Sequence, residues 1–150
     1  MAARKWSCLF ISLLMVSVFA GIAVAQEVQG SVESFQVKFK LDSATTKGLH
    51  MGEVWASPAK FTGARAGRLF IVEARAVALD ANGNDVDLAA TWKSANPSMV
   101  KVSPRTGKRV NFSVMKPGQG TVQVSYGNLT RKLDIKASYQ AGVMQVEIDQ

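Results

Sequence analysis

The stretch that decides the fold is DANGNDVDLAATWKSANPSMVKVS, residues 80–103. Its second half places a single Trp before a short polar segment, a Pro and alternating valines. Its first half is rich in side-chain oxygens, which come from Asp80, Asn82, Asn84, Asp85 and Asp87. The stretch allows two interpretations: a calcium loop followed by a strand, or a polar turn between strands of a sheet.

The stretch does not fit the geometry of an EF-hand calcium loop. An EF-hand loop needs Gly at position 6 and a bidentate Glu at position 12. Counted from Asp80, these positions hold Asp85 and Thr91. The sequence Asp-x-Asn-Gly is also preferred in tight turns between strands. We therefore expect a turn, and the alternative that stays open is a metal site of another type built from Asp80, Asp85 and Asp87.

Most of the chain after residue 30 alternates between apolar and polar residues, which is the pattern of half-buried strands. The longest strand candidate runs from Leu69 to Leu79. Its alanines favour a helix by propensity, but the strict alternation and the turn signal that follows favour a strand. One face of this strand then carries Phe70, Val72, Ala74, Ala76 and Ala78.

Turn signals divide the chain into short strands. Pro58 predicts that any strand over residues 54–61 is broken or lies at a sheet edge. Gly63 and Gly67 predict a turn before the long strand. Further alternating segments follow at intervals of about eight to twelve residues, a spacing typical of a β-sandwich or barrel. The sequence therefore predicts an all-β domain.

The N-terminus has the features of a secretory signal. Arg4 and Lys5 precede an apolar run over residues 6–22, and Ala23-Val24-Ala25 supplies a peptidase site before Gln26. We expect cleavage there, and an uncleaved membrane anchor is the alternative. Cleavage lowers Lys plus Arg from 18 to 16, leaves Asp plus Glu at 11 and gives a net charge of +5. It also removes Cys8, the only cysteine, so the core alone must stabilise the exported domain.

Three segments of the chain form a recognisable series: DANGNDV (80–86), ATWKSANPSMVKVS (90–103) and TGKRVNFSVMKPGQGTVQVSYGNLTRKLDIK (106–136). Together they resemble the bacterial immunoglobulin-like domain family, of the group-2 type in intimin- and invasin-like surface proteins. The resemblance covers roughly residues 55–137. It departs from the family pattern in the bulky strand at residues 69–79 and in the charged pair Lys108-Arg109. The matching residues are Asp80, Asn82-Gly83-Asn84, Thr91-Trp92, Ser94, Asn96-Pro97-Ser98, Val100, Val102-Ser103, Pro117-Gly118, Thr121-Val122 and Val124-Ser125.

The resemblance implies an immunoglobulin-like antiparallel β-sandwich, and the matching residues have physical reasons to specify it. A buried Trp92 would remove about 150–250 Å² of surface from water between two sheets. Pro97 keeps the residue before it out of the helical region, and Gly118 and Gly120 fit a turn that needs positive φ. We take Trp92, Pro97, Val100, Val102 and Gly118 as the core signature.

The predicted organisation has four parts: a signal peptide (1–25), an N-terminal extension with one strand (26–54), the immunoglobulin-like domain (55–137) and a C-terminal strand extension (138–150). We expect the strands of the two extensions to pair with each other or to lengthen a sheet edge. The resemblance leaves both extensions outside the family pattern.

The sequence favours binding over catalysis. His50 is the only histidine and lies in a polar connector, where a surface role is expected. We expect no cofactor, no nucleic acid and no membrane span after cleavage. The expected function is cell-surface adhesion or cell-envelope interaction by a periplasmic or extracellular module, whose partner is a protein or glycan of the cell surface or envelope. The alternative is a carbohydrate- or polyanion-binding accessory domain. Its ligand-binding candidates are Trp55, Lys108, Arg109 and Tyr139.

Overall fold

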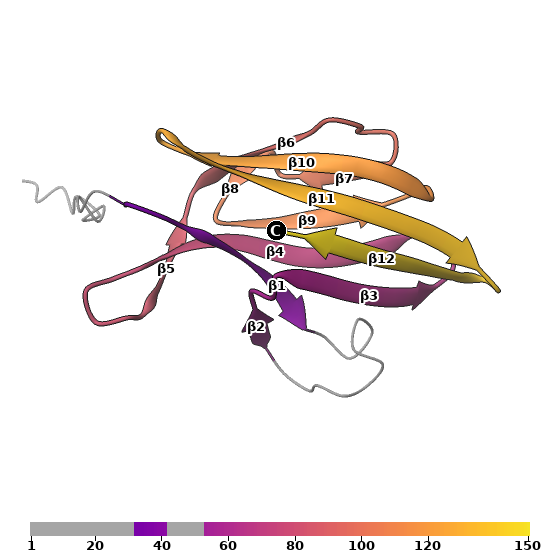
Figure 1. Cartoon of the computed structure of the whole chain (residues 1–150), viewed down its shortest axis with the longest axis horizontal. Coiled ribbons are helices and arrows are strands. Elements are labelled where there is room, and N and C mark those ends of the chain that lie inside the picture. The colour runs from indigo at the N-terminus through magenta and orange to yellow at the C-terminus, as the bar shows by residue number, and fades with distance from the viewer. Residues whose placement is uncertain (1–31, 42–52) are drawn as a thin grey trace, which may run out of the picture. The chain divides into compact units, whose positions relative to one another are not determined.

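The computed structural model describes residues 32–41 and 53–150, which belong to one compact unit. The described residues form two six-stranded sheets, and the strands within each sheet pair antiparallel (Figure 1). The strands are β1 (Gln36–Leu41), β2 (Val54–Ala56), β3 (Lys60–Ala66), β4 (Phe70–Leu79), β5 (Asp85–Leu88), β6 (Ala90–Ser94), β7 (Val100–Ser103), β8 (Thr106–Gly107), β9 (Arg109–Val114), β10 (Gly118–Tyr126), β11 (Leu129–Gln140) and β12 (Val143–Asp149).

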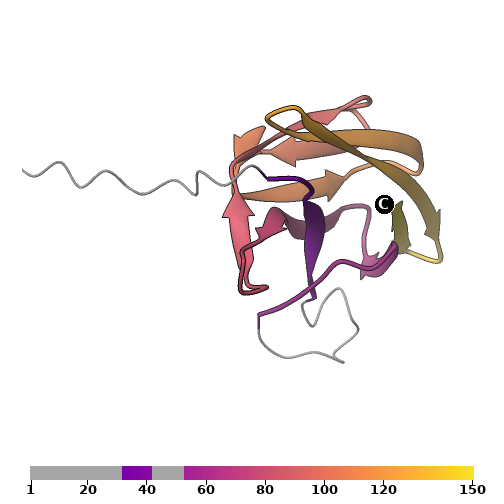
Figure 2. The same ribbon diagram turned by 60° about the vertical axis from the view of Figure 1, so that its left-hand side comes forward.

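The two sheets pack face to face as a β-sandwich, which confirms the predicted fold class at the level of an antiparallel sandwich (Figure 2). Sheet A has the order β2-β1-β4-β9-β7, and β5 pairs with β4 beside this path. Sheet B has the order β3-β12-β11-β10-β6-β8. One cluster of buried side chains draws its members from both sheets.

The strand prediction for residues 69–79 is confirmed. Strand β4 occupies the centre of sheet A, between β1 and β9. Its inward side chains are all buried and are Phe70, Val72, Ala74, Ala76 and Ala78. The alanines follow from this central position, because the bulky rings of neighbouring strands fill the space that larger side chains would need.

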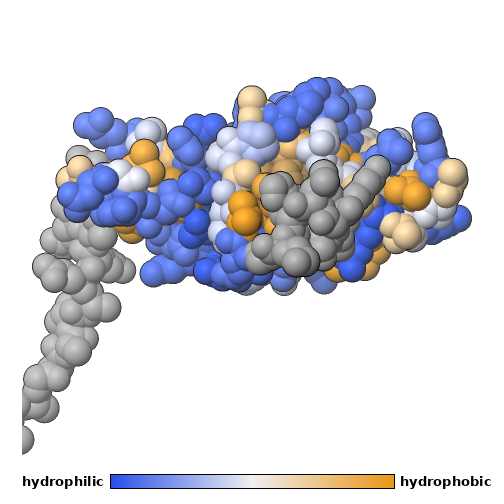
Figure 3. Space-filling view, turned by 90° about the horizontal axis from the view of Figure 1, so that it is seen from below, coloured by the Kyte–Doolittle hydropathy of each residue, from blue (hydrophilic) through white to orange (hydrophobic). Residues whose placement is uncertain are grey.

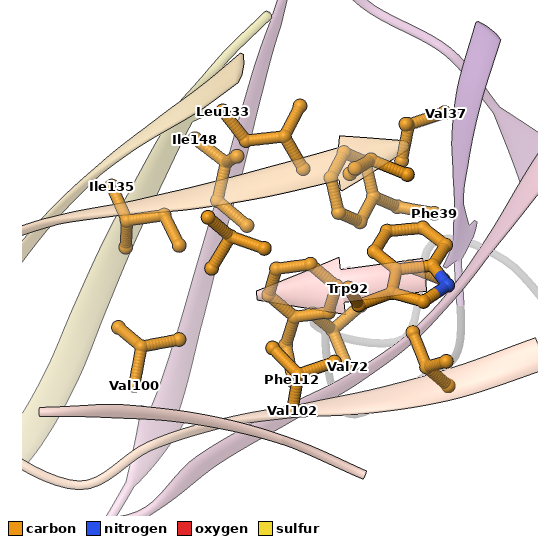
Figure 4. Packing of buried hydrophobic residues seen from close by; sticks show 14 of the residues in the cluster. Val37, Phe39, Val72, Trp92, Val100, Val102, Phe112, Leu133, Ile135 and Ile148 are labelled. Carbon is orange, nitrogen blue, oxygen red and sulfur yellow. The ribbon is translucent and has the colours of Figure 1, made fainter. Parts of the chain in front are cut away.

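Trp92 is the largest side chain that is fully buried, with 1% of its surface exposed. It projects from β6 of sheet B, and its indole meets the Phe112 ring of β9 in sheet A edge to face, with centroids 5.7 Å apart (Figure 4). Its Nε1 donates a hydrogen bond of 3.5 Å to the Gly107 carbonyl. Phe39 and Phe61 extend the aromatic core, with centroids 4.7 Å apart. The predicted role of Trp92 between the sheets is confirmed.

The rest of the core signature is located as follows. Val100 and Val102 are buried on β7, whereas Pro97 is exposed in the turn before that strand. Gly118 has φ 138°, a conformation that side chains disfavour. Gly120 does not have a positive φ, so that part of the expectation is wrong. It lies within β10, and a Cβ there would come within 3.3 Å of the Met99 sulfur, so close packing explains this glycine.

The turn predicted at Gly63 is wrong. Residues 60–66 form β3, and Gly63 lies opposite Val146 of β12. Only Gly67, with φ 91°, belongs to a turn. The break predicted at Pro58 is confirmed, because the chain leaves β2 of sheet A at Ala56 and enters β3 of sheet B at Lys60. A glycine inside a strand gives the same local signal as a glycine in a turn, which explains the error.

The two extensions do not pair with each other. Strand β1 lies in sheet A between β2 and β4, and β12 lies in sheet B between β11 and β3. Both therefore have a strand on each side, so the expectation of mutual pairing is wrong, and β12 instead lengthens sheet B beyond β11. Met144, Val146 and Ile148 of β12 are buried in the common core. No helix of the described residues is long and apolar enough to cross a membrane; the predicted signal peptide lies outside those residues.

Acidic residues on the outer face of sheet B are stabilised by nearby lysines. The pKa of Glu147 lies below its ordinary value of 4.5, chiefly because Lys60 donates a hydrogen bond of 2.8 Å to it. A lowered pKa adds stability that is complete above the ordinary value and is lost as the pH falls through the folded-state value. We expect the thermal unfolding temperature to fall with acid below about pH 4.5, and less steeply in Glu147→Gln. Equal pH profiles for the two proteins would contradict this.

Candidate functional site

The outer face of sheet A carries charged side chains around one tryptophan. Alternation places them there, because their neighbours along each strand point into the core. Strand β5 and the residue before β2 supply the remaining acids. We call this surface the Trp55 face and define it as Lys38, Lys40, Glu53, Trp55, Glu73, Arg75, Asp85, Asp87 and Arg109.

Three cations lie directly opposite one another across the centre of this face. Lys38 of β1 is opposite Arg75 of β4, which in turn is opposite Arg109 of β9. Like charges in this arrangement repel. Asp85 offsets the repulsion, because its carboxylate lies 2.7 Å from Lys38 Nζ and 3.0 Å from Arg75 NH2. Asp87 adds a second contact of 2.8 Å to Arg75 NH1. Strand β5 thus offsets the charges of Lys38 and Arg75, two of the three cations.

A second group of ion pairs lies beside the first. Lys40 contacts Glu53 at 2.8 Å and Glu73 at 3.5 Å, and Arg109 lies 3.9 Å from each of the same two carboxylates. The hydrogen bond from Lys40 lowers the pKa of Glu53, and the nearby Arg109 lowers it further. The Trp55 face therefore contains as many acidic as basic residues, and every one of them takes part in an ion pair.

Trp55 lies above the two arginines. Trp55 belongs to the edge strand β2, and its backbone is opposite that of Lys40 in β1. The Cζ atom of Arg75 lies 4.6 Å from the centroid of the indole ring, and that of Arg109 lies 5.4 Å away. Both distances are within the range of cation–π attraction. The half-buried indole is thus held on the sheet beside the carboxylates and guanidinium groups of the ion pairs.

The structure brings together two of the four ligand-binding candidates. Trp55 and Arg109 share the Trp55 face. Lys108 is exposed just before β9 and forms no ion pair with another described residue. Tyr139 lies at the far end of β11 in sheet B, where the Arg68 Cζ is 5.4 Å from its ring. Sequence reasoning did not identify Arg75 as a candidate, because the strand register that places it opposite Arg109 is not visible in the sequence.

The candidate metal ligands are not gathered into one site. Asp80 stabilises the turn in which it lies, because its carboxylate accepts hydrogen bonds of 2.8 Å from the backbone N–H groups of Asn82 and Asn84. These contacts, together with the Asn84 side chain, lower the pKa of Asp80. Asp85 and Asp87 belong to the ion pairs of the Trp55 face. Within residues 32–41 and 53–150, no group of three or more His, Cys, Asp or Glu side chains is placed to hold a metal ion.

Calcium is therefore expected to leave the protein's stability unchanged. A ligand that binds only the folded state raises the unfolding temperature, and the rise grows with the logarithm of the ligand concentration above its Kd. The oxygens of Asp80, Asp85 and Asp87 are already engaged by partners within the protein. We predict the same thermal unfolding curve with millimolar calcium and with a chelator, measured by circular dichroism. An unfolding temperature that rises with calcium and no longer rises in Asp85→Asn would show that these carboxylates bind the ion after all.

Arg75 is expected to stabilise the face that it organises. Its side chain is 15% exposed and contacts Asp85, Asp87 and Trp55. Arg75→Met would keep most of the apolar stem but leave Asp87 without its ion-pair partner. We expect the free energy of unfolding to fall by about 1–3 kcal/mol, the usual cost of an unsatisfied polar group. Urea unfolding measures this, with Lys101→Met on the same outer face as the control. An equal, small effect of both changes would contradict the expected role.

These features define a class of protein: a two-sheet antiparallel β-sandwich with a charge-balanced face centred on a tryptophan. The chain matches no protein-family model, no curated protein and no solved structure with which it was compared. His50 lies outside the described residues, so the structure adds nothing to its expected surface role.

Proposed function

We propose that this chain is an exported, non-catalytic binding module with an immunoglobulin-like fold, which attaches to a glycan of the cell surface or envelope through the Trp55 face. The observation that carries the proposal is the position of the Trp55 indole on Arg75 and Arg109. Export rests on the signal-like N-terminal sequence. The surface or envelope location rests on the resemblance to bacterial immunoglobulin-like domains.

The strand order supports the immunoglobulin-like part of the proposal. An immunoglobulin sandwich has strands A, B, E and D in one sheet and C, F and G in the other. Sheet A contains the corresponding order β1-β4-β9-β7, and sheet B contains β6-β10-β11. Trp92 projects from β6, at the position of the C strand that carries a buried Trp in antibody domains. Strands β12 and β3 then extend sheet B beyond the seven-strand pattern.

The chemistry of the Trp55 face supports a glycan as the ligand. Binding sites for small polar molecules combine an apolar or aromatic surface with a few fixed polar groups. Trp55 supplies an aromatic ring, and Glu53, Glu73 and Arg109 supply hydrogen-bond acceptors and donors around it. The equal number of acids and bases on this face favours an uncharged ligand over a polyanion.

A protein partner is the second candidate, and strand β3 favours it. Strand β3 is the last strand of sheet B, and on its other side no described strand pairs with it. An unpaired edge can accept a strand from a partner, with affinity from backbone hydrogen bonds. Gly63, Ala64 and Ala66 leave room for the approach of another chain.

Retention on immobilised peptidoglycan and on uncharged envelope polysaccharides tests the glycan proposal. We expect Trp55→Ala to weaken retention by at least about tenfold, because burial of a large apolar side chain against a ligand contributes about 1.5–3 kcal/mol. Trp55→Phe should keep part of the binding, and Tyr139→Ala should bind like the parent. Moderate salt should change retention little, because the proposed contacts are not to a polyanion.

Two outcomes would replace the proposal with an alternative, and a third would reject it. Retention that is insensitive to Trp55→Ala but lost in salt and in Lys108→Ala/Arg109→Ala would favour polyanion binding. Capture of a protein partner that is abolished by Ala64→Pro, with Trp55→Ala unaffected, would favour strand addition to β3. Absence of retention on every glycan at high protein concentration would reject the Trp55 face as a glycan site.

A further inference from the structure

One end of the sandwich collects positive charge without negative charge. Strands of both sheets end there, as the pairs Phe70–Val114 in sheet A and Gly118–Ala137 in sheet B show. The segments that form it are residues 64–72, 96–102, 112–120 and 136–146, and we call them the basic end. They contain no Asp or Glu, and their five cations are Arg65, Arg68, Lys101, Lys116 and Lys136. Of the five, Lys136 lies 3.5 Å from both Glu147 and Asp149, which come just after the last of these segments.

Four of these cations, Arg65, Arg68, Lys101 and Lys116, are exposed, and none of them forms an ion pair with another described residue. Arg65, Arg68 and Lys116 lie in or beside the loops at this end, where they can meet a ligand. The Arg68 guanidinium is held 5.4 Å from the Tyr139 ring. Tyr139 is opposite Met144 of β12, and Met144 is opposite Arg65 of β3, so the two arginines flank one end of sheet B. Cations gathered without acids create a local positive field.

Exposed apolar side chains lie among these cations. Leu69 is 45% exposed and Met115 is 36% exposed. Each lies one residue beyond the Phe70–Val114 pair, so they are neighbours at the end of sheet A. In the chain, Leu69 follows Arg68 and Met115 precedes Lys116. The view from below shows small apolar patches among hydrophilic residues, one of them towards the right-hand end (Figure 3).

The geometry points to an anionic lipid surface as the partner of the basic end. Arg65, Arg68 and Lys116 contact lipid phosphates, while Leu69 and Met115 enter the boundary between head groups and acyl chains. A water-soluble polyanion would use the cations but leave the two apolar side chains in water. A bilayer surface uses both, because peripheral proteins bind through apolar insertion combined with attraction to anionic lipids. This surface is separate from the Trp55 face and from its glycan.

Sedimentation with vesicles tests the inference. We expect the purified chain to bind vesicles that contain phosphatidylglycerol more tightly than pure phosphatidylcholine vesicles. Arg65→Gln/Arg68→Gln/Lys116→Gln should lower the partition coefficient on the anionic vesicles about 100-fold, since each cation near such a surface contributes about fivefold. The matched control Lys93→Gln/Arg105→Gln/Lys108→Gln removes the same charge from exposed positions elsewhere and should lower it by less than about fivefold.

The apolar pair separates lipid binding from general polyanion binding. Leu69→Ser/Met115→Ser should weaken binding to the anionic vesicles about tenfold, because it removes apolar surface that would be buried, and should leave retention on heparin unchanged. Thermal unfolding checks that each variant remains folded. The inference is overturned if both triple variants behave alike, or if both vesicle types bind equally. It is also overturned if the serine variant binds the anionic vesicles as the parent does, which would identify the basic end as a site for soluble polyanions.

Discussion

Trp92→Ala is expected to lower the free energy of unfolding by about 3–5 kcal/mol, the usual cost of truncating a large buried aromatic side chain. Trp92 is 1% exposed, and it joins the two sheets through its edge-to-face contact with Phe112. Its removal leaves a cavity between β6 and β9 that the surrounding strands cannot fill. For a domain of this size, such a loss is a large fraction of the total stability.

Trp55→Ala is the matched control for this change. It removes the same side chain from a half-buried position on the outer face of sheet A, where the indole contacts Arg75 and Arg109. We expect Trp55→Ala to lower the free energy of unfolding by at most about 1.5 kcal/mol. Urea unfolding followed by far-UV circular dichroism measures both, because this signal does not depend on tryptophan. Similar losses for the two variants would contradict the assignment of Trp92 to the core and Trp55 to the surface.

The local pattern of the sequence was sufficient to predict the strands around Trp92. Alternation determined the buried face of β4, and the turn signal at residues 80–84 predicted its end. These features depend on neighbours within about ten residues of the chain. Side chains alternate between the two faces of a strand, so a strand with alternating apolar residues can bury all of them on one face only. The alternation therefore predicts the buried face reliably.

Pairing between distant strands could not be predicted in the same way. Strand β12 pairs with β3, which precedes it by about 80 residues, and no local signal specifies that register. The role of Gly63 could not be predicted for this reason, since it depends on Val146 in the opposite strand. The Trp55 face could not be predicted for the same reason. Trp55, Arg75 and Arg109 come from three strands, and only the order β2-β1-β4-β9 brings them together.

Val146→Asp is expected to leave the protein largely unfolded at neutral pH. Val146 is 3% exposed in β12, opposite Ala137 of β11 on one side and Gly63 of β3 on the other. A carboxylate at this position would lie in the apolar core without a partner, and burial of an unpaired charge costs several kcal/mol. The effect should exceed that of Trp92→Ala, because it adds an unsatisfied charge and also removes apolar contacts.

Gln145→Asp introduces the same carboxylate one residue earlier in β12, where the side chain points away from the core. Gln145 is exposed and lies between Ser138 and Ala64, so we expect a change within about 0.5 kcal/mol. Far-UV circular dichroism and thermal unfolding of the two variants decide whether β12 is an integral strand. If β12 were a dispensable extension outside the core, both variants would fold with equal stability. Loss of structure in Val146→Asp alone would show that β12 is part of the core shared by both sheets.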